Sequence, residues 1–101
     1  MDKTEIKTRI AARIKGFRTA HNISQEDLAG QINTMITEYL EIPSHISKAT
    51  VSQWERGVFQ PDPLLFATIA AVENVPSEWE TTLQELASDI RSTQNGLTWQ
   101  E

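Results

Sequence analysis

The side chains best suited to chemistry lie between residues 47 and 57, in the run Ser-Lys-Ala-Thr-Val-Ser-Gln-Trp-Glu-Arg-Gly. Ser47 is a good N-cap and Gly57 suits a left-handed C-cap, so the run predicts one short helix over about residues 47–56. Val51 and Trp54 fall on the same side of that helix and can anchor it to a core. The opposite side is then left to meet solvent or a ligand.

The outward side of this predicted helix is small and mostly uncharged, whereas an ordinary solvated helix more often carries several Glu and Lys side chains there. Its members are Lys48, Ala49 and Gln53. Such groups match the donors, acceptors and methyl groups of base edges in the major groove of DNA. Gln53 is the strongest candidate for direct readout, because a Gln can bind adenine through two hydrogen bonds. Lys48 can reach guanine acceptors, and Ala49 can contact a thymine methyl group.

A second capped helix is predicted just upstream. Asn22 offers a helix stop, Ser24 offers an N-cap, and acidic residues follow in the first turn. Leu28 and Ile32 then share one face of this helix. Two capped helices in succession favour the base-reading interpretation of the second one.

In these two helices and their surroundings, the chain resembles the Cro and lambda-repressor type helix-turn-helix family, also called the xenobiotic-response-element type. The matching residues are Arg18, Ile23 to Ala29, Ser47 to Gly57, Pro61 and Leu65 to Ala70. They cover about residues 8–75, and they match in consistent order, whereas a lone Ser-Gln-Glu would not be specific. The resemblance implies an all-α, five-helix lambda-repressor-like domain that binds double-stranded DNA.

Position by position, the resemblance implies three sets of roles. The base-reading residues are Lys48, Ala49 and Gln53. The phosphate-contacting residues are Gln25, Ser47, Thr50 and Arg56. Arg18 and Glu55 match a pair that bridges the first and third helices, so we interpret them as a structural ion pair. The alternative for Glu55 is a solvated carboxylate.

The chain departs from the usual turn of about 3–4 residues between the two helices of such a unit. Here fourteen residues, 33–46, separate Ile32 from Ser47. Apolar residues continue at helical spacing into this insertion, so the second helix is extended and is expected to end near Leu40 or Glu41. The apolar stripe consists of Leu28, Ile32, Met35, Ile36, Tyr39 and Leu40. It must be buried against the rest of the domain or against another subunit. The alternative is that the long connection abolishes docking into the groove.

Two more helices are predicted in the rest of the chain. One begins near Pro63, and its core residues are Leu65, Phe66, Ile69 and Val72. The last begins with a capping box at Ser77 and covers about residues 77–92. Its apolar stripe is Trp79, Leu83, Leu86 and Ile90, and the carboxylates expected on its outer face are Glu78, Glu80, Glu85 and Asp89. The DNA-binding domain then covers residues 1–92, and residues 93–101 form a tail, either frayed or packed on a neighbouring molecule.

Acidic residues outnumber basic ones, and the formal net charge of −5 over 101 residues is unfavourable for nucleic-acid binding. The charge is unevenly distributed: residues 1–56 hold 8 Lys or Arg against 7 Asp or Glu, whereas residues 57–101 hold 1 against 7. The acidic excess therefore lies in the half that follows the base-reading helix. The Lys and Arg side chains of the first helix are either a solvated face or additional phosphate contacts.

Other function classes find little support in the sequence. His21 and His45 are isolated, and no glycine-rich phosphate loop or nucleophile motif occurs, so we expect no enzyme, no metal site and no cofactor. The lack of cysteine excludes a zinc finger. No run is long enough to span a bilayer and no signal-peptide pattern is present, so a cytoplasmic or nucleoid-associated protein is expected.

Three function classes follow from these observations. The leading one is a sequence-specific transcriptional regulator, a homodimeric repressor that occupies a palindromic operator with its recognition helices about 34–36 Å apart. The Tyr39 stripe or the Trp79 to Ile90 stripe would form the dimer contact. The second class is an antitoxin that binds its own promoter and binds a basic toxin through the acidic C-terminal half. The third is a protein-interaction module that has lost DNA binding.

Overall fold

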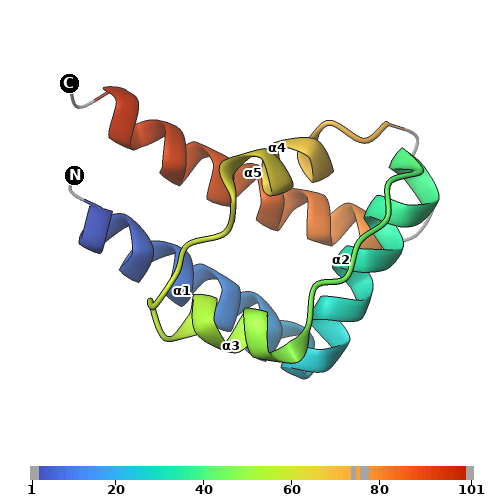
Figure 1. The fold of residues 1–101 in the computed structure, drawn as a ribbon, viewed down its shortest axis with the longest axis horizontal. Coiled ribbons are helices and arrows are strands. Elements are labelled where there is room, and N and C mark those ends of the chain that lie inside the picture. The colour runs from blue at the N-terminus through green and yellow to red at the C-terminus, as the bar shows by residue number, and fades with distance from the viewer. Residues whose placement is uncertain (1–2, 74, 76–77, 100–101) are drawn as a thin grey trace.

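Five α-helices form the part of the chain that this computed structural model describes, residues 3–73, 75 and 78–99, and no strand occurs among those residues (Figure 1). The helices are α1 (Lys3–His21), α2 (Gln25–Leu40), α3 (Lys48–Glu55), α4 (Pro63–Ala70) and α5 (Glu78–Trp99). The predicted all-α class with an extended second helix is confirmed. The expected capping box at Ser77 lies outside the described residues.

The two longest helices, α1 and α5, run antiparallel, so the start of α1 and the end of α5 lie at the same end of the molecule (Figure 1). The short helix α3 packs against α1 and α2, and α4 packs against α5. All five helices contribute to one core. Its fully buried side chains include Ile10, Ile14, Leu28, Ile32, Met35, Val51, Phe66, Ile69, Leu83 and Ile90.

Local sequence signals account for the limits of α2. The Ser24 hydroxyl accepts from the Asp27 amide at 2.9 Å, and the Asp27 carboxylate accepts from the Ser24 amide at 3.2 Å, which completes a capping box. The preceding helix stops at Asn22, whose φ of 53° is left-handed. At its other end α2 stops at Glu41, which is also left-handed with a φ of 55°. The predicted stop at Asn22 and the end near Leu40 are both confirmed.

The apolar stripe of α2 is buried against the rest of the same chain. Ile32 and Met35 have no exposed surface and Ile36 is 6% exposed, whereas Tyr39 and Leu40 pack partly buried against the same core. The sequence left open whether this stripe packs against its own domain or against another subunit. The structure shows that it packs against its own domain.

Glu80 does not lie on an acidic outer face, so that prediction is wrong. Glu80 is only 5% exposed, and its Oε2 accepts a hydrogen bond from the Tyr39 hydroxyl at 2.8 Å. Burial of the carboxylate is tolerated because the phenol supplies a partner. The bond joins the end of α2 to the start of α5. The remaining carboxylates of this predicted face, Glu78, Glu85 and Asp89, are exposed.

The last helix continues beyond the predicted limit at residue 92 and includes most of the predicted tail. Asn95 and Gly96 do not end it, although the pair is a common turn signal. Tertiary contacts hold this part of the helix: Thr93 is buried, and the Gln94 amide donates to the Pro61 carbonyl at 3.0 Å. Residues 93–99 therefore belong to α5, and the prediction that they form a separate tail is wrong.

Candidate nucleic-acid interface

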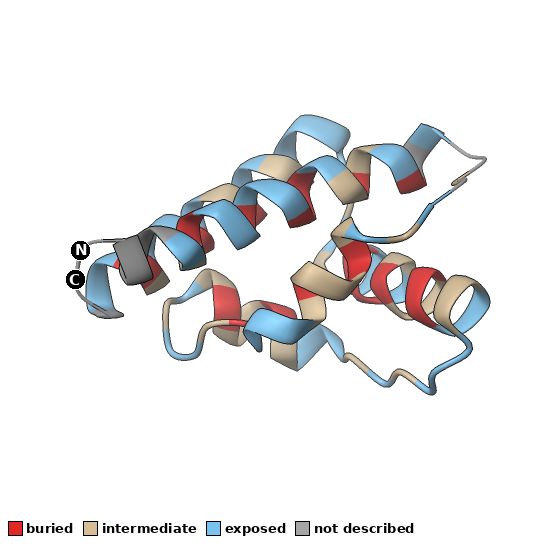
Figure 2. Ribbon diagram, turned by 90° about the horizontal axis from the view of Figure 1, so that it is seen from above, coloured by how far each residue is buried: buried red, intermediate tan, exposed pale blue. Residues whose placement is uncertain are grey.

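The start of α3 is exposed at the surface of the domain. The Ser47 hydroxyl accepts from the Thr50 amide at 3.2 Å, as expected for an N-cap, and Ser47, Lys48 and Ala49 are all exposed. On the opposite side Val51 is fully buried and Trp54 is 4% exposed. The helix is therefore held by its predicted apolar side and presents its first turn to solvent (Figure 2).

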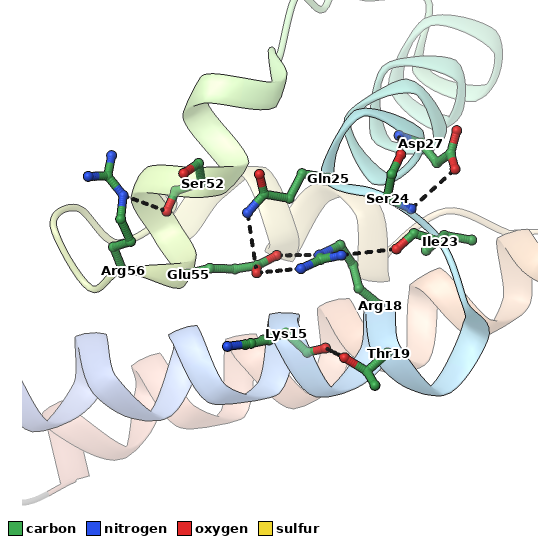
Figure 3. Close-up of polar contacts among 10 residues, drawn as sticks. All are labelled: Lys15, Arg18, Thr19, Ile23, Ser24, Gln25, Asp27, Ser52, Glu55 and Arg56. Carbon is green, nitrogen blue, oxygen red and sulfur yellow. Dashed lines mark hydrogen bonds and ion pairs between the residues drawn. The ribbon is translucent and has the colours of Figure 1, made fainter.

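The other residues expected to meet DNA lie along the same short helix. Thr50 and Gln53 are partly exposed, and Arg56 is exposed directly after the last helical residue. The Arg56 Nε donates to the Ser52 carbonyl at 3.4 Å, which leaves the rest of the guanidinium directed away from the helix (Figure 3). Gly57 follows with a left-handed φ of 71°, the conformation predicted for it.

Arg18 of α1 and Glu55 of α3 form the predicted ion pair (Figure 3). The Arg18 Nε donates to Glu55 Oε2 at 2.5 Å and Nη2 donates to Oε1 at 2.8 Å, while Nη1 donates to the Ile23 carbonyl at 3.0 Å. The Glu55 side chain is 5% exposed, so it is not a solvated carboxylate. Glu55 is the one acidic residue of α3, and its inward turn leaves the outer side of the helix without a carboxylate.

Electrostatics keep both partners of this pair charged. The hydrogen bond to Glu55 raises the pKa of Arg18 further, although burial opposes this rise. Burial also raises the pKa of Glu55, but hydrogen bonds from Arg18 and Gln25 and the nearby charge of Lys15 outweigh it and hold that pKa below its ordinary value. A charged, bidentate pair of this kind fixes geometry as well as charge.

Gln25 lies at the N-terminus of α2, next to this ion pair (Figure 3). Its Nε2 donates to Glu55 Oε1 at 3.4 Å, a long hydrogen bond. The structure thus brings Gln25 close to the C-terminal end of α3, whereas Ser47 and Lys48 lie at the opposite end of that helix. Three of the four expected phosphate contacts, Ser47, Thr50 and Arg56, belong to α3 or flank it directly.

One residue that shapes this surface was not predicted. The side chain of Asn33, in the middle of α2, forms three hydrogen bonds with Ser44 and Ile46 in the connection before α3. These partners lie 11 and 13 residues further along the chain. No local pattern links an Asn to partners at such separations, so the sequence offered no signal for the contact.

A groove of about 500 Å³ opens beside α3, between the connection and α4. Its mainly apolar lining includes Ile36, Ile42, Pro43, Ile46, Trp54, Leu64 and Leu65. Ile42 is 51% exposed and Leu64 is 71% exposed. The walls of this groove come from segments far apart in sequence, so it could not be found by spacing.

Within residues 3–73, 75 and 78–99, no group of three or more His, Cys, Asp or Glu side chains is placed to hold a metal ion. In the same residues, no helix is both long and apolar enough to cross a membrane.

Comparisons with protein-family models, with curated proteins and with solved structures found no match to this chain. Any functional assignment therefore depends on the residues and contacts of the surface around α3.

Proposed function

We propose that the protein is a sequence-specific DNA-binding transcriptional regulator of the helix-turn-helix kind, which represses transcription by occupying an operator. The observation that carries this proposal is the outer side of α3. Lys48 and Ala49 are exposed and Gln53 is partly exposed, while Glu55, the acidic residue of the helix, is paired inward with Arg18. A helix that exposes amide, ammonium and methyl groups and no outward carboxylate suits a negatively charged groove.

The proposed DNA contacts fall into two chemical classes. Lys48, Ala49 and Gln53 would meet base edges, which specify sequence, whereas Gln25, Ser47, Thr50 and Arg56 would meet phosphates, which set position. The acidic excess lies in the second half of the chain, where Asp62, Glu73, Glu78, Glu85 and Asp89 are exposed. A protein that binds the chromosome in this way would be cytoplasmic and associated with the nucleoid.

A homodimer on a palindromic site is part of this proposal. Both stripes considered for the dimer contact contribute to the core of a single chain: Met35 and Ile36 do so in α2, and Leu83, Leu86 and Ile90 do so in α5. A two-fold contact would therefore have to use exposed side chains. The mass of the protein in solution, alone and with duplex, measures the stoichiometry.

The function is tested by selecting duplexes from a random-sequence pool with the 101-residue chain. Enrichment of a common sequence is expected, and affinity for it should fall as salt rises, by about 0.9 in log K per unit of log salt for each phosphate that a Lys or Arg side chain neutralises. Absence of enrichment together with absence of duplex affinity at low salt would exclude the proposal.

A second candidate is an antitoxin that uses the same DNA-binding surface and also binds a basic toxin. The charge distribution favours it, because residues 57–101 hold 1 basic residue against 7 acidic ones. Co-purification of a small basic protein, released by high salt, is the expected result for an antitoxin. Recovery of the chain free of any such partner from its native source would count against this candidate.

A further inference from the structure

The connection between α2 and α3 is fastened by the amide of Asn33. Its Oδ1 accepts from the Ile46 amide at 2.8 Å and from the Ser44 hydroxyl at 2.7 Å, and its Nδ2 donates to the Ile46 carbonyl at 2.9 Å. The orientation of the side-chain amide is determined, because the reverse orientation would set donor against donor and acceptor against acceptor. One side chain thus forms hydrogen bonds with both the backbone N–H and the backbone carbonyl of Ile46.

Ile46 directly precedes Ser47, the N-cap of α3. Asn33 itself is carried by α2 beside Ile32, which is fully buried in the core. The three hydrogen bonds therefore tie the first turn of α3 to a rigid helix. The connection from residue 41 to residue 47 has no helix or strand of its own that could do so.

The opposite end of α3 is held independently. Glu55, its last residue, is bound by Arg18 of α1, and Gln25 of α2 donates to the same carboxylate. The buried side chains Val51 and Trp54 anchor the middle. Apolar contacts resist removal of the helix from the core but are non-directional. Polar contacts at both ends add directional attachments to this apolar packing.

We infer that Asn33 is a positioning residue for base reading: by clamping Ile46, it sets the placement of Ser47, Lys48 and Ala49 relative to a bound duplex. This inference rests on the proposed DNA-binding function. Base contacts require donors and acceptors to be aligned, whereas attraction to phosphates tolerates displacement. Loss of the clamp should therefore reduce discrimination between sequences more than it reduces affinity for DNA in general.

The test compares the affinity of each variant for the selected duplex with its affinity for a scrambled duplex. For Asn33→Ala the ratio of the two affinities should fall about fivefold or more, the equivalent of one net hydrogen bond, while affinity for the scrambled duplex stays unchanged. A smaller fraction of folded protein lowers both apparent affinities by the same factor and leaves their ratio unchanged. Thr37→Ala is the matched control, because Thr37 lies exposed on the same helix, and it should behave like the unmodified protein.

A milder variant covers the case in which Asn33→Ala does not fold. Ser44→Ala removes one of the three bonds and leaves the Ile46 pair, so a smaller fall in the same ratio is expected. An unchanged ratio in every folded variant would overturn the inference and leave the proposed function standing. If the unmodified protein shows no preference for any duplex, the proposed function fails and the positioning role of Asn33 fails with it.

Discussion

Arg18 and Glu55, 37 residues apart in sequence, are joined by two hydrogen bonds that attach α3 to α1. The contact performs two tasks. It anchors the C-terminal end of the helix that we propose enters DNA, and it withdraws the carboxylate of that helix from the surface that would face phosphates. A pair that looks purely structural therefore also determines the electrostatic character of the candidate interface.

Arg18→Ala should destabilise the fold by about 3 kcal/mol, because it leaves the nearly buried Glu55 carboxylate without its charged partner. The free energy of unfolding in urea, followed by circular dichroism, measures this effect. Arg9→Ala is the control, since the Arg9–Glu5 pair has both side chains 49% exposed. Its cost should stay below about 0.5 kcal/mol. Equal costs for the two variants would contradict the role given to the Arg18–Glu55 pair.

Acid should weaken the contribution of Glu55. Its folded-state pKa lies below the ordinary value of 4.5, so the unfolded state takes up the proton first as pH falls. The stabilisation is then fully present above about pH 4.5 and is lost as pH falls through the folded-state pKa. Glu55→Gln removes this titration, so the difference in unfolding free energy between it and the unmodified protein should shrink as pH falls below about 4.5. A difference that stays constant from neutral to acid pH would show that the pKa of Glu55 is not lowered by folding.

Tyr39 should ionise at unusually high pH. The hydrogen bond to Glu80, together with burial, raises its pKa from 10.0 to about 12. Because this pKa is raised, the stabilisation is fully present below pH 10.0 and is lost as pH rises toward about 12. Tyr39 is the single tyrosine of the sequence, so the absorbance of tyrosinate reports on it alone. Titration at the ordinary value while circular dichroism shows an intact fold would disprove the contact with Glu80.

Gln53→Ala should lower affinity for the preferred duplex far more than affinity for random duplex. The expected loss of discrimination is about 1–3 kcal/mol, the worth of one bidentate base contact. Gln31→Ala on α2 is a suitable control for the loss of a glutamine away from α3, and it should leave both affinities unchanged. Equal losses on both duplexes would remove Gln53 from the base-reading set.

Gln25→Ala should weaken preferred and random duplexes alike, because a phosphate contact carries no sequence information. The slope of log affinity against log salt should keep its value, since Gln25 is uncharged and releases no counterion. Arg56→Ala, by contrast, should reduce that slope by about 1. A loss confined to the preferred duplex would contradict the phosphate assignment of Gln25.

Features with local causes were predictable from the sequence. Ser24 and Ser47 cap their helices because a serine hydroxyl reaches an amide within the first turn, and Gly57 adopts a left-handed φ that costs it little. The apolar spacing likewise predicted which sides of α2 and α3 are buried. The lambda-repressor-like identity and the DNA-binding roles stay predictions.

Only the tertiary structure decided which distant groups meet. It buried Glu80 in a hydrogen bond with Tyr39, extended α5 past Asn95, and gave the long connection its anchor at Asn33. The physical reason is that periodicity identifies the buried face of a helix without identifying its neighbour. A polar side chain is then directed by whichever unpaired group the packed core brings within hydrogen-bonding distance.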